Sequence, residues 1–358
     1  MHEFDIDVEP LDGLSSRERQ VLEAVVRTYV DTAEPAGSRT VSKRHELGVS
    51  PATVRNTMSD LEEKGYLFHP HTSAGRIPTD RAYRYFVDQV IRPADLSEAE
   101  RERIQQELEG AGSSAVEKIV RRATRALSLL SYELGLAVVP RLEDAVLEKL
   151  DLIQVSAEKV LLVATIRSGL IRTIYVDLPG EVPPDTLITL AMLLNERLAG
   201  LTLQELQSSL PERLRDAAPG DDPTGELLNI FMQSGAELMD WPGSEGGHVH
   251  LGQTSILAAQ PEFTSGERLK GLIELTERRD LLASALGSRE HSGGLKITIG
   301  GEHRSEILTD FTLVTAEYRA GGLKGVIGVI GPTRMPYEKV IAIVDYTSRM
   351  VSDLLTPS

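Results

Sequence analysis

The chain has 358 residues, no cysteine, and 54 acidic against 38 basic side chains, which gives a formal net charge of −16 at pH 7. This length predicts two or three domains with cores of their own. The absence of cysteine excludes disulfides, thiolate metal sites and cysteine nucleophiles, and it favours a reducing compartment, for which the cytoplasm is the simplest candidate. The sequence has no run of 18 apolar residues and no apolar stretch at its start, so we expect neither a membrane span nor a signal peptide.

The chain opens with an acidic tail, expected over residues 1–14, and a helix is predicted from about residue 16 to residue 31. Ser15 and Glu18 have the spacing of a capping box, in which each side chain bonds to the other residue's backbone N–H. Apolar side chains then recur every three or four residues. The pattern predicts one amphipathic helix with a single buried face.

Two shorter helices are predicted next, over residues 38–47 and 51–64. The Glu-Pro-Ala-Gly turn at residues 34–37 separates the first helix from the second, which a glycine ends. Ser50 and Pro51 are expected at the cap and at the first position of the third helix. Three such helices in succession indicate a helix-turn-helix domain.

The third helix has an apolar and a polar face. Val54, Met58 and Leu61 recur at helical spacing and are expected to point inward. The outer face then carries short, polar or cationic side chains, namely Ala52, Thr53, Arg55, Asn56 and Ser59.

A small hairpin is predicted after the third helix. Residues 66–68 have the composition of a strand, and the turn-rich loop that follows, HPHTSAGRIP, carries Arg76 near its tip. A further amphipathic helix over residues 79–91 precedes an Arg-Pro boundary. This is the layout of a winged helix-turn-helix domain, which we place at residues 15–92.

Basic residues are concentrated in this domain. Residues 35–92 contain nine basic and six acidic side chains, so they carry a net charge of +3 while the rest of the chain carries −19. Contact with nucleic acid is therefore expected only here, with Arg55 reading guanine and Asn56 reading adenine through paired hydrogen bonds in the major groove. The other residues expected to contact DNA, mostly at phosphates, are Ser38, Arg39, Thr40, Lys43, Arg44, Ser50, Ala52, Thr53, Ser59, His71 and Arg76.

The rest of the chain is predicted to be an α+β domain with an interruption. A charged connector is expected over residues 93–145, with helix across 97–136. The α+β domain is placed at residues 146–204 and 293–358, and the inserted segment at 205–292. Predicted strands cover residues 146–153, 160–166, 170–176, 295–302, 311–319 and 324–332, and predicted helices cover 186–198 and 337–355.

The sequence carries no pattern of catalytic chemistry. It lacks GxSxG, HExxH and phosphate-loop motifs, so we expect no enzyme. The pairs His69 and His71, and His248 and His250, have no carboxylate or thiolate at ligand spacing, so neither a metal nor a cofactor is predicted. Arg334, in the loop before the last helix, is expected to fix that loop or to bind an anion or a carboxylate of its own domain.

Two blocks of the sequence are distinctive. Residues 17–88 include an EPAGSRT turn before the second helix and a PHTSAGRIPTDRAYR run after the third. Residues 299–341, from IGGEHRSEIL to TRMPYEKVI, form the second block. Both blocks resemble the HrcA family of bacterial heat-inducible transcription repressors, and together they reach both ends of the chain.

The resemblance implies a fold and a function. The fold would be an α+β multidomain one, with an N-terminal winged helix-turn-helix, a GAF-like domain and an inserted dimerising segment. The function would be that of a homodimer on the double-stranded DNA of an inverted-repeat operator upstream of chaperone operons. The GroE chaperonin would keep it competent to bind, and heat-damaged proteins would titrate the chaperonin away. Ser73, Gly75 and Arg76 would belong to the DNA-contacting wing.

Two other functions remain open for the same layout. One is a metabolite-sensing regulator whose GAF-like domain binds a ligand and whose winged helix serves as output. The other is a winged-helix adaptor that binds protein without contacting DNA. A ligand-dependent rise in melting temperature would favour the first.

Overall fold

The N-terminal part of the computed structural model folds as the expected winged helix-turn-helix domain. Ser15 and Glu18 form the predicted capping box, and the apolar stripe of the first helix is buried. Strand Leu67–Phe68 pairs antiparallel with strand Ile77–Pro78. The elements are α1 (Ser16–Thr32), α2 (Ser38–Arg44), α3 (Pro51–Glu63), β1 (Leu67–Phe68), β2 (Ile77–Pro78), α4 (Asp80–Tyr85) and the π-helical turn η1 (Phe86–Val90).

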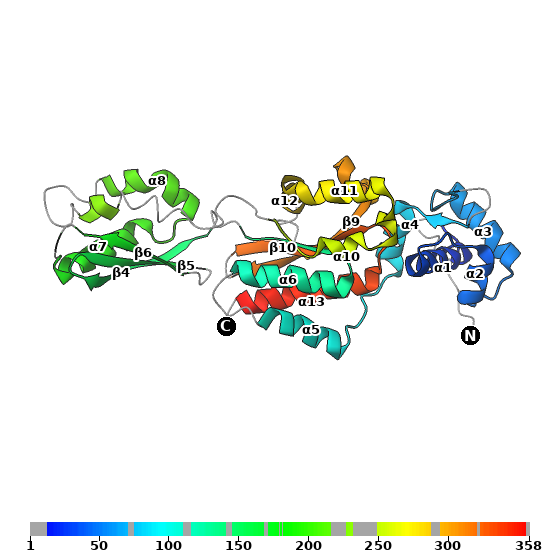
Figure 1. Cartoon of the computed structure of the whole chain (residues 1–358), viewed down its shortest axis with the longest axis horizontal. Helices are drawn as coiled ribbons and strands as arrows, with labels where there is room; N and C mark the ends of the chain where they lie inside the picture. Colours follow the sequence, from blue (N-terminus) through cyan, green and yellow to red (C-terminus); the bar gives the residue numbers. More distant parts are fainter. Residues whose placement is uncertain are drawn as a thin grey trace, which may run out of the picture.

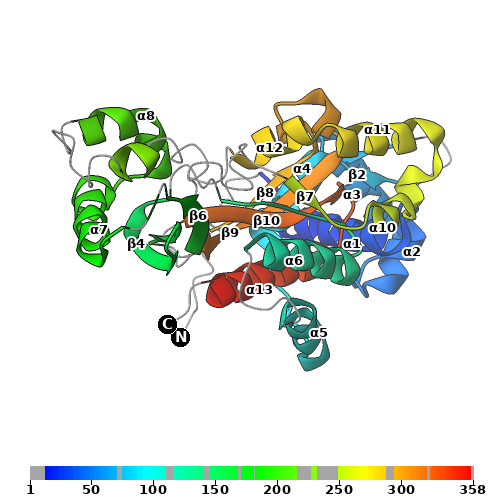
Figure 2. The same ribbon diagram turned by 60° about the vertical axis from the view of Figure 1, so that its left-hand side comes forward.

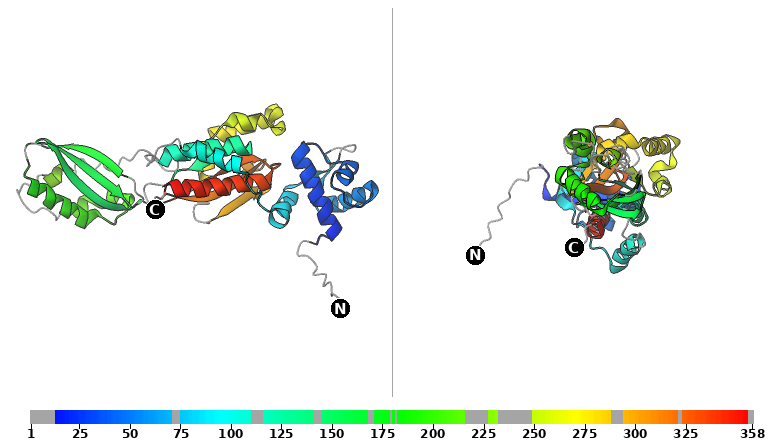
Figure 3. Two further views of the ribbon diagram at one scale, coloured as in Figure 1. Left: turned by 90° about the horizontal axis from the view of Figure 1, so that it is seen from below. Right: turned by 90° about the vertical axis from the view of Figure 1, so that its left-hand side faces the viewer.

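Three parts follow one another along an elongated molecule (Figures 1 and 3). The winged helix lies at one end, a central domain follows, and the described residues between 145 and 231 form a third part at the other end. Within the described residues, no helix combines the length and the apolar character needed to cross a membrane. The structure describes residues 13–70, 75–109, 116–140, 145–167, 171–178, 180, 182–215, 227–231, 249–287, 294–320 and 323–355.

A five-stranded antiparallel sheet forms the central domain, in the order β7-β3-β10-β9-β8. Side chains alternate across it, so Leu134 and Leu136 join the core on one face and Ala137 joins the core on the other. The strands are β3 (Leu134–Val138), β7 (Val249–Leu251), β8 (Leu295–Ile299), β9 (Phe311–Ala320) and β10 (Leu323–Pro332).

Helices cover both faces of this sheet (Figure 2). The first group, with α6 and α13 against the sheet, consists of α5 (Glu98–Glu109), α6 (Val116–Ser131) and α13 (Tyr337–Leu355). The opposite group consists of α10 (Thr254–Ala258), α11 (Gly266–Glu277) and α12 (Arg279–Gly287). An antiparallel sheet between two groups of helices confirms the α+β fold class.

The connector differs from the continuous helix predicted over residues 97–136. It contains two helices, α5 and α6, and residues 134–138 form strand β3 in the interior of the sheet. All five residues of β3 are buried because helices cover both faces of the sheet. A strand buried on both faces has a continuous apolar run, which cannot be told from a buried helix by periodicity.

The third part has a sheet and a core of its own. Strands β4, β5 and β6 pair only with one another among the described residues. One face of this sheet packs against leucines of two helices, and that core is separate from the two cores of the central domain. The elements are β4 (Leu147–Ser156), β5 (Lys159–Ile166), β6 (Ile171–Asp177), α7 (Pro184–Leu198) and α8 (Leu203–Arg215).

The domain boundaries predicted after residue 145 were therefore wrong. Residues 146–204, assigned to the GAF-like domain, belong to the separate third part. Residues 249–287, assigned to the insertion of residues 205–292, lie on the central sheet instead. The error arose because the alternation of residues 146–176 indicates strands without showing which sheet they join, since sheet membership depends on long-range pairing.

A buried carboxyl group lies beside the central sheet. Glu133 is 1% exposed, and its Oε2 accepts a hydrogen bond from Gln260 Nε2 at 3.0 Å. A Cβ atom at Gly331 would lie 1.9 Å from that oxygen, so only glycine leaves room for the carboxyl group. Burial raises the pKa of Glu133 well above its ordinary value.

The raised pKa of Glu133 predicts a pH-dependent stability. The native state keeps the proton that the unfolded chain loses above pH 4.5, so the contribution of Glu133 falls as the pH rises. We expect Glu133→Gln to stabilise the protein relative to wild type, with a gain that is larger at pH 8 than at pH 5. Melting temperatures at both pH values measure this gain, and Glu267→Gln on exposed α11 is the control. A constant difference from wild type would contradict the prediction.

Candidate nucleic-acid interface

Helix α3 presents a polar face to solvent because its apolar face is fixed inside the winged helix. Ser50 caps the helix, since its Oγ accepts a hydrogen bond from the Thr53 N–H at 3.1 Å. Arg55 and Asn56 are exposed on the outer side. The predicted inward face is confirmed, and Thr57 belongs to it as well: the buried residues are Val54, Thr57, Met58 and Leu61.

Helix α2 adds cations beside α3. Val41 is buried and anchors α2 in the domain, which leaves Arg39 and Lys43 exposed. No ion pair or hydrogen bond with another described residue engages the Arg39 or Lys43 side chain. Arg44 differs, because its guanidinium lies 2.6 Å from Asp31 Oδ2 and is partly neutralised. Arg39 and Lys43 are therefore the uncompensated charges of α2.

His45 follows α2 and adds no charge near neutral pH. Its Nε2 lies 2.9 Å from the hydroxyl of Thr28. Burial, followed by the adjacent guanidinium of Arg44, lowers the pKa of His45 below its ordinary value of 6.5. The positive charge of α2 and α3 at pH 7 consequently comes from arginine and lysine.

The arrangement of α2 and α3 suits the major groove of B-DNA. Ala52 and Asn56 are four residues apart on one side of α3, and the small Ala52 leaves room for close approach. Arg55 lies next to Asn56, and both have the donors and acceptors that distinguish base edges. Arg39 and Lys43 on the neighbouring helix are placed for the phosphates beside the groove.

The remaining predicted residues of α2 and α3 have identifiable surroundings. Ser38, at the start of α2, is half-buried, while Thr40 is exposed. The Ser59 hydroxyl donates to the carbonyl of Arg55 at 3.3 Å. Their DNA contacts stay a prediction, as do those of His71 and Ser73, which lie outside the described residues.

Gly75 and Arg76 lie at the base of the wing rather than at its tip. The backbone of Arg76 exchanges two hydrogen bonds with Ala36, at 2.8 and 3.0 Å. The Arg76 side chain is only 18% exposed, and its Nε lies 2.8 Å from a carboxylate oxygen of Glu62 on α3. The expected position of Arg76 was therefore wrong: this cation joins the wing to α3 and to the turn before α2.

Gly75→Ala tests the role of this close approach. A Cβ atom at Gly75 would lie 2.4 Å from the carbonyl carbon and oxygen of Ala36, which are backbone atoms that cannot move aside alone. We expect a loss of about 1 to 3 kcal/mol in stability, with a lower melting temperature. Gly271→Ala is the control, because a Cβ atom there has nothing within 4 Å. Equal melting of the two variants would show that the wing base tolerates displacement.

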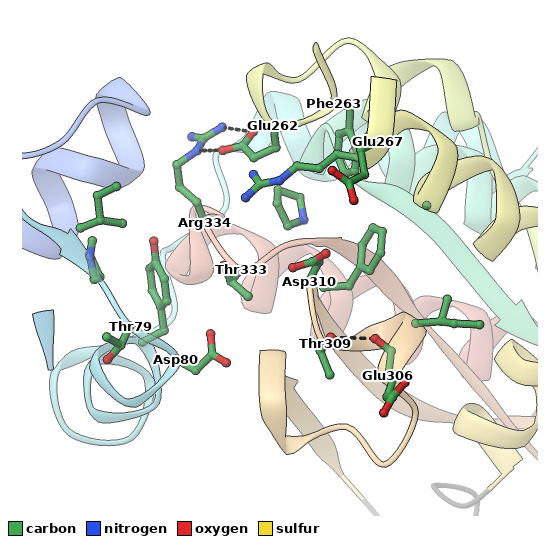
Figure 4. A pocket seen from close by; sticks show the side chains of 18 of the residues that line it. Thr79, Asp80, Glu262, Phe263, Glu267, Glu306, Thr309, Asp310, Thr333 and Arg334 are labelled. Atoms are coloured by element: carbon green, nitrogen blue, oxygen red, sulfur yellow. Dashed lines mark hydrogen bonds and ion pairs between the residues drawn. The ribbon is translucent and has the colours of Figure 1, made fainter. Parts of the chain in front are cut away.

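A cleft of about 800 Å³ lies between the winged helix and the central domain (Figure 4). Its walls combine Thr79 and Asp80 from the winged helix with Glu267, Asp310 and Arg334 from the central domain. Acidic side chains outnumber basic ones in this wall. The cleft lies at one of the places where the two parts meet, and none of its lining residues belongs to α3.

Sequence reasoning missed one contact within the winged helix and one between the winged helix and the central domain. Glu62 was not singled out, although it lies on the third helix fourteen residues before Arg76. Arg334 was singled out, and its expected carboxylate partner is confirmed as Glu262 of the same domain. Its second contact, with the carbonyl of Val30, joins residues 304 positions apart, a separation that no local pattern indicates.

Comparisons with known proteins agree with this organisation. A family model described as the HrcA protein C-terminal domain matches residues 117–341. A heat-inducible transcription repressor HrcA of Chlorobium chlorochromatii is 36% identical over 96% of this chain and 98% of its own, and one of Geobacter sulfurreducens is 36% identical over 96% and 99%. A solved structure described as a hypothetical protein shares the fold, with a TM-score of 0.63 and 22% identity over 96% of this chain and 99% of its own. The chain therefore belongs to the HrcA family, whose curated relatives are heat-inducible transcription repressors.

Proposed function

We propose that this protein represses chaperone operons of the heat-shock response by binding an inverted-repeat operator as a homodimer, and that it acts in the cytoplasm. The exposed polar face of α3 beside the uncompensated cations of α2 carries the proposal. Arg55 and Asn56 read bases, and Arg39 and Lys43 hold the backbone. Membership of a repressor family supports the same assignment.

The winged helix alone binds weakly, which gives a reason for the dimer. Residues 15–92 carry a net charge of only +2 on a chain of net charge −16, so a single winged helix makes few phosphate contacts. An inverted repeat has a two-fold axis, so two protomers related by that axis read both halves together and raise the affinity through effective concentration.

The third part of the molecule is our candidate for the dimer interface. One face of its sheet packs on α7 and α8, and the other face exposes Ile153, Ile171 and Tyr175 at 52, 65 and 64%. Ile153 and Tyr175 lie in one cross-strand row with Leu161, whereas Val163 lies in the next row beside Asp151, and Ile171 lies in the row after that. Ion pairs lie among these rows, between Lys149 and Asp151 and between Lys159 and Asp177. Exposed apolar side chains combined with charged ones on a single face suit a subunit interface.

Release on heating follows, in our proposal, from the GroE chaperonin. The chaperonin keeps the repressor competent to bind, and heat-damaged proteins compete for it, so repression is lifted until damage is cleared. A fluorescence-anisotropy titration tests both parts, with a duplex selected from a randomised inverted-repeat library and a scrambled duplex, at fixed salt. Selective binding that GroE strengthens supports the proposal. Equal, weak binding to both duplexes by freshly folded dimer would refute it.

The cleft between the winged helix and the central domain favours one second candidate, a ligand-sensing regulator. A ligand bound there would contact both parts and bias their relative position. Unlike the pocket expected inside the GAF-like domain, this one lies at its border. A screen of metabolites for a rise in melting temperature distinguishes the two functions, because the repressor needs no small molecule for operator binding.

A further inference from the structure

The winged helix is docked on the central domain through polar contacts at several points. Arg27 of α1 lies 2.8 Å from Glu338 of α13, and Arg84 of α4 bonds both carboxylate oxygens of Glu302 at 2.7 and 2.5 Å. Asp80 of α4 also accepts the N–H of Gly301 at 2.8 Å. The winged helix and the central domain are therefore held together by direct contacts and not only by the linker between them.

Arg334 makes the most buried of these connections. Its guanidinium forms a bidentate pair with Glu262, in which Nη2 lies 3.0 Å from Oε2 and Nε bonds the other oxygen (Figure 4). The remaining Nη1 donates to the carbonyl of Val30 at 2.7 Å. The side chains of Arg334 and Glu262 are only 14 and 12% exposed, so water and salt screen this pair less than the others.

The contact with Val30 provides a hydrogen-bond donor for a carbonyl at the C-terminal end of helix α1. The last four carbonyls of a helix lack partners within it, and Val30 is among them because α1 ends at Thr32. The last turn of α1 also has no basic side chain of its own. Arg334 thus supplies from the central domain the hydrogen bond and the positive charge that the C-terminal end of α1 favours. Because α1 packs on α3, this contact fixes the direction in which α3 points.

The direction of α3 matters for DNA binding because the winged helix lies far from the proposed dimer interface. The winged helix lies at the opposite end from the third part, which we assign to the dimer interface (Figures 1 and 3). A small rotation at the joint therefore displaces each recognition helix along the DNA. Resting on the proposed function, we propose that Arg334 is a positioning residue for operator binding, which fixes the angle of the winged helix and thereby the half-site spacing that the dimer accepts.

The experiment varies the spacing between half-sites in the selected duplex. Wild type should lose about tenfold or more in affinity when 5 base pairs are inserted, because half a helical turn moves one half-site to the opposite side of the DNA. Arg334→Ala should lose no more than about threefold on the same insertion, because the winged helix is then held less firmly at its angle to the central domain. Affinity for a duplex with a single half-site should be unchanged in the variant.

Controls keep the test decisive. Arg349→Ala removes an arginine from an exposed pair with Asp345 on α13 and should behave as wild type. If Arg334→Ala fails to fold or loses half-site binding, Glu262→Gln is used instead, because it weakens the same bidentate pair. Arg334→Lys should keep only part of the spacing selectivity of wild type. Unchanged spacing selectivity in Arg334→Ala or Glu262→Gln overturns the inference. A wild type without operator selectivity instead overturns the proposed function, so the two failures are distinguishable.

Discussion

Replacing Arg55 by alanine should abolish most operator selectivity while leaving weak binding to unrelated duplexes. A bidentate contact between arginine and guanine discriminates against a wrong base by about 1 to 3 kcal/mol. The two copies in a dimer double that loss, to about 2 to 6 kcal/mol on an inverted repeat. Arg55 is exposed and outside the core of α3, so the variant should fold and melt as wild type does. Anisotropy titrations on selected and scrambled duplexes measure the loss.

Lys43→Ala is the matched control for Arg55→Ala. Both changes remove one exposed cation of the winged helix, but Lys43 lies on α2, where phosphates are the expected partners. Lys43→Ala should weaken both duplexes equally and reduce the slope of log affinity against log salt by about 1 per protomer. Asn56→Ala should relax discrimination at one base pair of each half-site. Uniform weakening by Arg55→Ala and Asn56→Ala would contradict our division between base readers and phosphate binders.

Local patterns were sufficient for the winged helix. The capping box at Ser15, the cap at Ser50 and the spacing of Val54, Met58 and Leu61 are relations between residues at most a few positions apart, and the structure confirms each. Physical rules for caps and amphipathic faces act over one or two helical turns. The exposed polar face of α3 follows directly, because burial of one side of a helix exposes the other.

Long-range pairing could not be predicted in the same way. Strand β3 pairs with β10 and β7, which lie far along the chain. Strands β4 to β6 pair with their neighbours in sequence and form a separate sheet. Alternation indicates a strand but not its neighbours. The same limit explains Arg76, whose pairing with Glu62 depends on how the wing returns to α3. The sequence position of Arg76 within the loop did not predict its place in the structure, because its backbone pairs with Ala36 in a distant turn.

Tyr175→Asp should convert the dimer into a folded monomer and lower operator affinity by about 10²-fold or more. Tyr175 is 64% exposed in the isolated chain, so aspartate there leaves the core of the third part intact. It lies in one cross-strand row with Leu161 and Ile153, and all three side chains of this row are apolar or aromatic. A carboxylate buried there without a partner would be costly to desolvate. Analytical ultracentrifugation measures the oligomeric state, and anisotropy measures the affinity.

Met192→Asp provides a matched control on the opposite side of the same part. Met192 is 68% exposed on α7, which covers the other face of the sheet, so the substitution adds the same charge outside the proposed interface. We expect this variant to remain dimeric and to bind the operator as wild type does. A monomer produced by Met192→Asp and not by Tyr175→Asp would move the interface to the helical face. Affinity for a single half-site should be unaffected in both variants, because α3 lies at the other end of the molecule (Figure 1). Loss of half-site binding by Tyr175→Asp would instead indicate that the third part and the winged helix are coupled in folding.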